Sequence, residues 1–294
     1  MNVSCIVHGK KDSRLLKSHL QKSEGIEWKI YSTSDQASAT ELTMQAITQG
    51  TDRILAVGGD GTWNEVVNGI LTSDDPATPA ILYPLGTGND WSRTWPAPGD
   101  SEELNARLLS KPVKKIDVGH ILYTSPVGQS ASRYFVNIAD AGMGAQVVRK
   151  VNDRSKWLGA DLTFVRAIIE TFITYNNAEV CLEADEFSHT GLIRSVIVAN
   201  GKYFGSGMCI APEAAPDDGR FAIVIIGDVS VVDYLKYLPA IRRGELIQHP
   251  GVSYHSASHV KIQSPGKLEL EADGEFLGFV PAEINVMPQA LCVV

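Results

Sequence analysis

The first 120 residues alternate between short apolar runs and segments with helical spacing, and this alternation restricts the possible folds more than any other feature of the chain. Four runs have the composition of strands: residues 3–7, 27–33, 53–57 and 79–86. Three segments with helical spacing lie between them: residues 13–23, 36–50 and 62–73. Parallel neighbouring strands need long crossover connections, which helices supply. Residues 1–120 are therefore predicted to form an α/β domain with a parallel sheet.

The pattern changes near residue 118. Most later segments are short and rich in β-branched residues, and one stretch with helical spacing, residues 162–175, interrupts them. We expect a mainly β domain of residues 121–282, packed closely against the first because no Pro-, Gly- or Ser-rich linker separates the two. Residues 283–294 are expected to return to the first domain and complete it.

Composition limits the classes of function. With 26 Lys and Arg against 34 Asp and Glu, the formal charge of −8 argues against general binding to nucleic acid, which needs a basic surface. The four cysteines are far apart and fit neither a zinc signature nor a disulfide framework, so buried thiols in a reducing compartment are expected. No signal-peptide pattern opens the chain, and the longest apolar stretch, residues 221–232, is too short to span a bilayer. These features predict a cytoplasmic protein.

A glycine-rich turn follows the third predicted strand, in the sequence AVGGDGTWNEVVNG of residues 56–69. Such a turn lets backbone N–H groups approach an anion at a helix N-terminus, where the helix dipole also favours negative charge. Thr62 and Glu65 have the spacing of a capping box that would start the helix directly after the turn. The turn matches neither of the two common glycine-rich phosphate motifs, GxGxxG and GxxxxGK(S/T). A tight turn that binds no ligand would have the same pattern of residues.

A second glycine-rich turn, PLGTGNDWSR at residues 84–93, follows the fourth predicted strand. In open α/β sheets, ligands bind beyond the carboxyl ends of the strands. Both turns are therefore expected to face one crevice and to bind a phosphate group there.

These two segments resemble the paired nucleotide-binding signatures of the diacylglycerol kinase catalytic domain, in the form found in bacterial soluble lipid kinases. Four further segments resemble the same family: KKIDVG at 114–119, FVNIADAGMGA at 135–145, residues 198–221, and LELEADGEFLG at 268–278. GGDGT alone is shared with NAD kinases and resembles the GGDGS of phosphofructokinases. The Asn-Glu that follows it, the GTGND turn and the late DGE make the resemblance specific.

The resemblance implies an α/β plus β kinase of the NAD kinase/diacylglycerol kinase-like type, with ATP bound between the α/β domain and a C-terminal β-sandwich domain for the lipid substrate. The residues that it implies for the ATP site are Thr33, Gly58, Gly59, Asp60, Gly61, Thr62, Trp63, Asn64 and Thr87. The alternative reading of Asp60 is a turn-former that bonds its own backbone, and its place within two matched turns favours function.

The resemblance also implies a general base near the C-terminus. Either Asp273 or Glu275 takes the proton from the lipid hydroxyl, with Glu275 the usual assignment and Asp273 a base or metal partner. Phosphoryl transfer depends mainly on alignment and charge stabilisation, so carboxylates serve as base or as Mg²⁺ ligands. Asp117 is a further candidate acid. A solvated hairpin turn would also explain the Asp273-Gly274 pair.

A structural Mg²⁺ is a second implication of the resemblance. It would be bound by the Asp218 side chain and by the backbone carbonyls of Ala215 and Arg220, since Mg²⁺ prefers hard oxygen ligands. An Asp-Gly turn before a strand is the alternative reading of this segment.

A cluster of basic and apolar residues precedes the helical stretch at 162–175 and is a candidate for transient contact with an anionic membrane: Arg149, Lys150, Arg154, Lys156, Trp157 and Leu158. A solvated helix end would have the same composition. Exposed strand edges of the β domain would permit a homodimer.

The first turn departs from the family. Residues 6–14, IVHGKKDSR, replace the usual Asn-Pro and Ser-Gly phosphate loop, although Lys10, Lys11 or Arg14 could reach phosphate. The expected function is an ATP- and Mg²⁺-dependent kinase for diacylglycerol or a related lipid alcohol. Three alternatives stay open: a kinase for another lipid such as phosphatidylglycerol or a sphingoid base, an NAD kinase-like enzyme, and a nucleotide-binding paralogue without catalysis.

Overall fold

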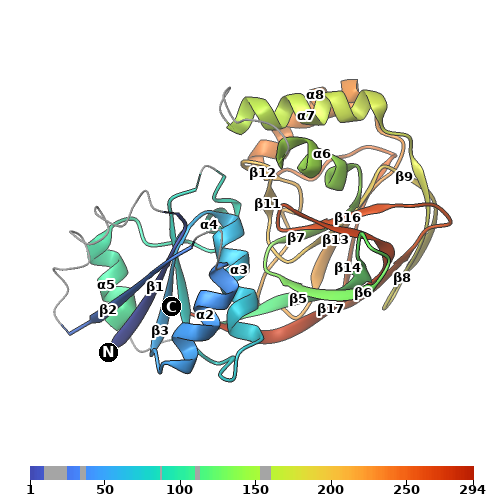
Figure 1. Cartoon of the computed structure of the whole chain (residues 1–294). Helices are drawn as coiled ribbons and strands as arrows, with labels where there is room; N and C mark the ends of the chain where they lie inside the picture. Colours follow the sequence, from blue (N-terminus) through green and yellow to red (C-terminus); the bar gives the residue numbers. More distant parts are fainter. Residues whose placement is uncertain (10–24, 34–37, 87, 110–112, 153–159) are drawn as a thin grey trace.

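The protein has two lobes, seen side by side in Figure 1. The computed structural model describes residues 1–9, 25–33, 38–86, 88–109, 113–152 and 160–294. The helix expected at residues 13–23 lies outside these ranges.

The first lobe contains a parallel sheet, as the alternating pattern predicted. Its strands are β1 (Asn2–Val7), β2 (Glu27–Ser32), β3 (Arg53–Gly58) and β4 (Ala80–Pro84), in the order β2-β1-β3-β4. The last strand of the chain reaches the same sheet, because Val293 pairs in parallel with Ala80. The carboxyl ends of β3 and β4 therefore lie at one edge of the sheet, where both glycine-rich turns begin.

Helices cover both faces of this sheet. On one face, α2 (Ala39–Thr48) and α3 (Asp60–Leu71) pack Ile47, Val66 and Ile70 against the strands. On the other face, α5 (Ser101–Leu109) contributes Leu104 and Leu108. The short helix α4 (Asp90–Thr94) follows the second glycine-rich turn.

The predicted capping box of Thr62 and Glu65 is wrong. Helix α3 begins at Asp60 with Gly59 as its N-cap, so Thr62 already lies within the first turn. The Glu65 carboxylate instead accepts a hydrogen bond of 2.7 Å from the backbone N–H of Ala39, the first residue of α2. Glu65 therefore joins two helices rather than starting its own.

The second lobe is an antiparallel sandwich. Its strands are β5 (Lys114–Thr124), β6 (Ser130–Phe135), β7 (Ile138–Gly142), β8 (Ala178–Ala184), β9 (Ser188–Ile193), β10 (Ser195–Ala199), β13 (Phe221–Ile226), β14 (Val252–Ala257), β15 (His259–Gln263), β16 (Glu269–Ala272) and β17 (Glu275–Val293). One layer has the order β14-β13-β10-β7-β16-β17, and the other runs β6-β5-β17-β15-β8-β9. The main apolar core fills the space between them. This confirms the expected α/β plus β fold.

Strand β17 connects the two lobes because it is 19 residues long. Its first residues pair with β16, its middle with β15 and β5, and its end with β4. A short separate hairpin, β11 (Tyr203–Phe204) and β12 (Met208–Cys209), faces α4 of the first lobe.

Three helices lie together at one edge of the sandwich: α6 (Met143–Asn152), α7 (Ala160–Thr174) and α8 (Val231–Arg243) (Figure 1). Helix α7 matches the helical stretch expected at 162–175, whereas α6 and α8 were not expected. A capping box of Ser230 and Asp233 begins α8, and Gly244, with φ of 74°, ends it. No helix among the described residues is long and apolar enough to cross a membrane.

We predict that Gly119→Ala destabilises the sandwich by about 1–3 kcal/mol, because a Cβ there would overlap the ring of the buried Phe135 on the neighbouring strand. Gly266→Ala is the control, since an exposed Cβ there has no atom within 4 Å. Urea unfolding of both variants tests this, and equal midpoints would contradict the packing at Gly119.

Candidate functional site

A cleft of about 550 Å³ is lined by residues of both lobes. The first lobe contributes residues 59–63 and the second glycine-rich turn. The second lobe contributes residues 136–138, 204–206 and the hairpin of residues 271–275. The two glycine-rich turns thus share one crevice.

The two turns touch backbone to backbone. The N–H of Leu85 donates to the carbonyl of Gly58 at 2.8 Å. A Cβ on Gly86 would lie 2.5 Å from Cα of Gly59, and one on Gly59 would lie 3.2 Å from Cα of Gly86. Glycine is needed at both positions because any side chain would separate the turns.

The N-terminus of α3 opens into this cleft. Asp60, Gly61 and Thr62 form its first turn and line the cleft, and the N-cap residue, Gly59, has no side chain with which to cap the helix. The first N–H groups of a helix have no partner within the helix, and the dipole makes this end positive. The arrangement is suited to binding an anion.

Asp60 supports the second turn. Its carboxylate accepts hydrogen bonds from the backbone N–H groups of Asp90 at 3.1 Å and Trp91 at 3.0 Å, the first residues of α4. Helix α4 has no side-chain cap of its own, since its N-cap is Asn89 in a left-handed conformation. Asp60 therefore caps a neighbouring helix instead of its own turn.

Asp90 in turn joins the two lobes. Its carboxylate accepts hydrogen bonds from the backbone N–H groups of Ser206 at 2.9 Å and Gly207 at 2.7 Å. These residues have φ of 66° and 94°, so the backbone turns its N–H groups toward the first lobe. Burial, and then repulsion by Asp60, raises the pKa of Asp90 to about 6.

Asp273 forms a second link between the lobes. Its carboxylate accepts four hydrogen bonds, from Nδ2 of Asn64 at 2.7 Å and from the backbone N–H groups of Val136, Asn137 and Ile138 at 2.8, 2.9 and 3.0 Å. A carboxylate has about four lone-pair sites, so this set saturates it. Burial raises the pKa of Asp273, and the four hydrogen bonds oppose that shift.

Glu275 and Glu271 line the cleft from the same hairpin. Glu275 is exposed, and its Oε1 lies 4.0 Å from the position of a Cβ on Gly61, at the N-terminus of α3. Glu271 is buried and accepts a hydrogen bond of 2.9 Å from the N–H of Gly274. Burial, and then repulsion by Asp140, raises the pKa of Glu271 well above its usual value.

The sequence analysis did not single out Glu271 or Asp140. Both are buried, at 2% and 1% exposure respectively; Asp140 is the one acid in strand β7, whereas β16 contains Glu269 as well as Glu271. An acidic residue inside an otherwise apolar strand was the available signal for Asp140, and ELEA gave no such signal for Glu271.

The expected ATP-site residues fall into three groups. Gly59, Asp60, Gly61, Thr62 and Trp63 line the cleft, although the Trp63 ring is also part of the apolar core. The cleft lining does not include Gly58, Asn64 or Thr33. The Oγ1 atom of Thr33 instead accepts a hydrogen bond of 3.0 Å from the N–H of Gly9 and holds the chain at the end of β1. Thr87 lies outside the described residues.

The proposed structural Mg²⁺ loop is a turn held by hydrogen bonds. Asp218 is exposed, and its Oδ1 accepts the N–H of Arg220 at 2.9 Å, as in an Asx turn. Asp117 is buried and accepts the N–H groups of Gly219 and Gln289 at 2.6 and 2.8 Å, so it anchors this loop from outside the cleft. No cluster of three metal-binding side chains occurs among the described residues. The turn accounts for Asp218 without an ion, and metal binding with Ala215 and Arg220 stays a prediction.

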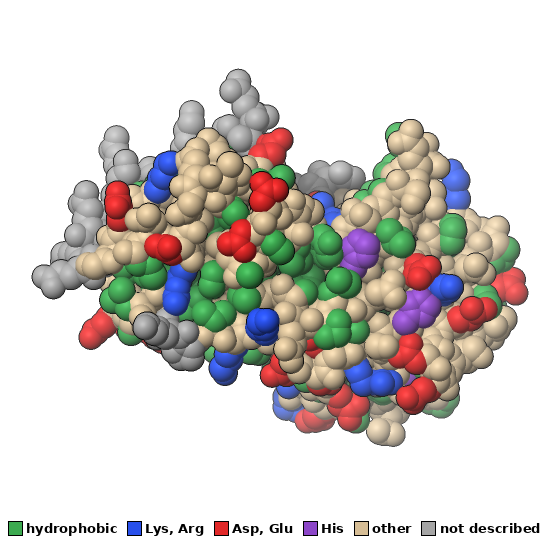
Figure 2. All heavy atoms as spheres, turned by 90° about the horizontal axis from the view of Figure 1, so that it is seen from below, with side chains coloured by type: hydrophobic (Ala, Val, Ile, Leu, Met, Phe, Trp, Pro, Cys, Tyr) green, Lys and Arg blue, Asp and Glu red, His purple; other side chains and the backbone are tan. Residues whose placement is uncertain are grey.

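Two members of the expected membrane cluster are described, and both have partners within the protein. Arg149 forms an ion pair with Glu269 at 2.5 Å, and Lys150 donates to Thr171 at 3.1 Å. Arg154, Lys156, Trp157 and Leu158 lie outside the described residues. On the face shown in Figure 2, Lys and Arg side chains are scattered among Asp and Glu.

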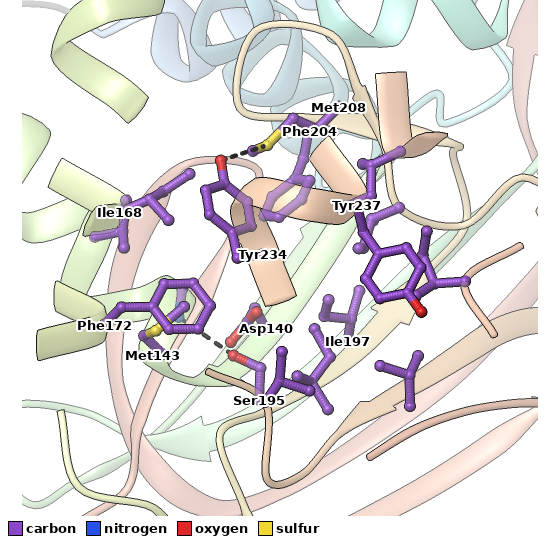
Figure 3. Close-up of a pocket in the computed structure, with 18 of the residues that line it drawn as sticks. Asp140, Met143, Ile168, Phe172, Ser195, Ile197, Phe204, Met208, Tyr234 and Tyr237 are labelled. Atoms are coloured by element: carbon purple, nitrogen blue, oxygen red, sulfur yellow. Dashed lines mark hydrogen bonds between the residues drawn. The ribbon is translucent and has the colours of Figure 1, made fainter. Parts of the chain in front are cut away.

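An apolar cavity of about 100 Å³ adjoins the cleft (Figure 3). Its wall consists mainly of side chains from α6, α7, α8 and strand β10, among them Ile168, Phe172 and Tyr234. Val148 and Phe204 line both the cavity and the cleft. A polar site with anion-binding N–H groups therefore borders an apolar one.

Two family models match the chain: the diacylglycerol kinase catalytic domain over residues 2–121 and the YegS C-terminal NAD kinase β-sandwich-like domain over residues 137–294. A diacylglycerol kinase of Staphylococcus carnosus (strain TM300) is 30% identical over 279 residues, which cover 94% of this chain and 88% of the relative. A diacylglycerol kinase of Bacillus subtilis (strain 168) is 29% identical over 276 residues, which cover 92% and 88%.

Solved structures share the fold. A putative diacylglycerol kinase from Bacillus anthracis str. Sterne superimposes with a TM-score of 0.77 at 22% identity, covering 100% of this chain and 96% of the other. Yeast NADH kinase complexed with NADH gives a TM-score of 0.54 at 14% identity, covering 98% and 78%. From its two matched domains and its relatives, the chain belongs to the family that joins a diacylglycerol kinase catalytic domain to a YegS-type C-terminal β-sandwich.

Proposed function

We propose that this protein is an ATP- and Mg²⁺-dependent lipid kinase that transfers the γ-phosphoryl group of ATP to the hydroxyl of diacylglycerol or a related lipid alcohol. One observation carries the proposal: the N-terminus of α3 and the carboxylate of Glu275 lie beside each other in a cleft that borders an apolar cavity. This juxtaposition supports phosphate binding, proton transfer and lipid binding at adjacent points.

In this proposal the phosphates of ATP bind at the first N–H groups of α3, beside the contact of the two glycine-rich turns. Asp60 accepts one hydrogen bond on each carboxylate oxygen, so both oxygens keep a lone pair. Hard oxygen donors of this kind fit Mg²⁺, with Asp60 as a ligand. The ion would neutralise charge on the phosphate oxygens.

Glu275 is the proposed general base. A base must reach the proton of the substrate hydroxyl, and Glu275 lines the cleft in which that hydroxyl would lie. Asp273 is a positioning residue in this proposal, because protonating it would break one of its four hydrogen bonds. The first part of a lipid chain would enter the apolar cavity, with the hydroxyl pointing past Val148 and Phe204 toward Glu275.

The proposal is tested by incubating the purified protein with labelled ATP, Mg²⁺ and a panel of lipid alcohols in mixed micelles. Label should appear in diacylglycerol or a related lipid and disappear when Mg²⁺ is chelated. ATP binding without labelled lipid would instead favour a nucleotide-binding paralogue. Labelled NAD would favour an NAD kinase-like enzyme.

We predict that Glu275→Gln lowers kcat by at least about 100-fold, the usual contribution of a general base, and leaves stability nearly unchanged because the side chain is exposed. Asp273→Asn should instead destabilise the protein by about 1–3 kcal/mol for each N–H group left unpaired. Turnover and urea unfolding are measured on both variants. If Asp273→Asn lost turnover with an unchanged unfolding midpoint, Asp273 would be the base.

We predict that Gly86→Ala weakens ATP binding at least tenfold, or about 1.4 kcal/mol, because the added Cβ would separate the two glycine-rich turns. Gly99→Ala is the control in the same lobe, since its Cβ would meet only the flexible Glu103 side chain, at 3.5 Å. Calorimetric titration with Mg²⁺ and a non-hydrolysable ATP analogue measures both. Equal affinities would contradict phosphate binding at this contact.

A further inference from the structure

Asp140 is an unexplained polar residue in the wall of the apolar cavity. It lies on β7, is 1% exposed, and its Oδ1 has no hydrogen-bond partner. No Lys or Arg occurs among the described residues that line the cavity. Buried polar atoms are rarely left without a partner, so a single unpaired oxygen in an apolar cavity points to a group that arrives from outside.

The position of Asp140 follows from strand register. Ile197 on β10 lies opposite Asp140, and Asp140 lies opposite Glu271 on β16. Directly opposed residues of antiparallel strands project to the same face of a sheet. Ile197, Asp140 and Glu271 thus form a row of side chains across three neighbouring strands. Ile197 and Asp140 line the cavity and Glu271 lines the cleft, so Asp140 lies at the border between the two spaces.

The distance along β7 is short. Ile138 lines the cleft, and Asp140 is two residues further along the strand, about 7 Å at the usual strand rise. A lipid whose hydroxyl lies in the cleft would therefore bring atoms only a few bonds from that hydroxyl close to Asp140. In a diacylglycerol, those atoms include the ester carbonyls.

Asp140 lines the cavity, and Ser195 and Gly144 pack against its carboxyl group. The hydroxyl of Ser195 and the N–H of Gly144 interact with the carboxyl group, and a Cβ on Gly144 would lie 2.5 Å from Oδ2. Figure 3 shows Asp140 and Ser195 at the base of the cavity, below Tyr234 and Phe204. The same Cβ would lie 3.0 Å from Oδ1, so Gly144 packs against both oxygens, and Oδ1 is the oxygen without a hydrogen-bond partner.

We propose that Asp140 selects ester-linked lipids by donating a hydrogen bond from Oδ1 to an ester carbonyl of the substrate. This rests on the proposed function, because it assumes that the lipid occupies the cavity. Burial raises the pKa of Asp140 to about 7, so a large share of the carboxyl group is protonated at neutral pH. Since Oδ1 is the oxygen without a hydrogen-bond partner, it is the one that can carry the proton.

The test compares a 1,2-diacylglycerol with the 1,2-dialkylglycerol of equal chain length, which has the same hydroxyl but no carbonyl. The wild type should favour the ester lipid at least tenfold in kcat/KM. Asp140→Leu should reduce this ratio toward one. Asp140→Asn should keep most of it, because the amide oxygen can accept from Ser195 and Gly144 while its NH₂ group donates to the carbonyl. Ile197→Val, on the same row, is the control and should keep the ratio.

Three results would overturn the proposal: equal kcat/KM for both lipids in the wild type, an unchanged preference for the ester lipid in Asp140→Leu, or loss of that preference in Asp140→Asn. The last result would indicate that a carboxylate at this position accepts a hydrogen bond from the substrate. If Asp140→Leu does not fold, the wild-type ratio and Asp140→Asn decide. If neither lipid is phosphorylated, the proposed function fails. Thermal-shift titration of the wild type and Asp140→Asn with the two lipids in micelles then tests recognition by itself, and equal shifts would overturn it.

Discussion

The cleft depends on carboxylates that accept hydrogen bonds from N–H groups of the opposite lobe, either backbone or side-chain. Asp90 of the first lobe holds the turn at Ser206 and Gly207, and Asp273 of the second lobe holds Asn64 of α3 together with its own residues 136–138. Hydrogen bonds to ionised acceptors are roughly twice as strong as those between neutral groups. They fix how far apart the lobes lie, and hence the distance from the N-terminus of α3 to Glu275.

Acidic residues that look alike in the sequence have different roles in this arrangement. Asp60, Asp90 and Asp273 each bind at least two N–H groups, so their negative charge orients the backbone. Glu275 is the exposed member and faces the cleft. A substitution at any of the three aspartates would move the turns that surround the proposed ATP site, so loss of activity in such a variant is weak evidence for a chemical role.

Local patterns predicted the parallel sheet and the meeting of both glycine-rich turns, because strand and helix periodicity and the shared edge of parallel strands follow from short-range sequence. They failed where partners are distant. Glu65 fits a local capping box, yet it caps α2, and that depends on how two helices pack. Asp140 and Glu271 become neighbours only through the pairing of strands more than 120 residues apart. Helix α8 was missed for a different reason. Its capping box of Ser230 and Asp233 and its C-terminal Gly244 are local signals, but the surrounding segments are rich in β-branched residues and favoured strands.

The charge of the cleft restricts how it can bind a phosphate ester. The acids that line it include Asp60, Glu65, Asp90, Glu271 and Glu275, and no Lys or Arg occurs among its described lining residues. Backbone N–H groups and one helix dipole supply only partial positive charge. Under the proposed function, a divalent cation bound with the nucleotide would offset the negative charge of these acids. If the proposed function holds, the same acids that hold the lobes together would favour the metal-bound form of ATP over the free nucleotide.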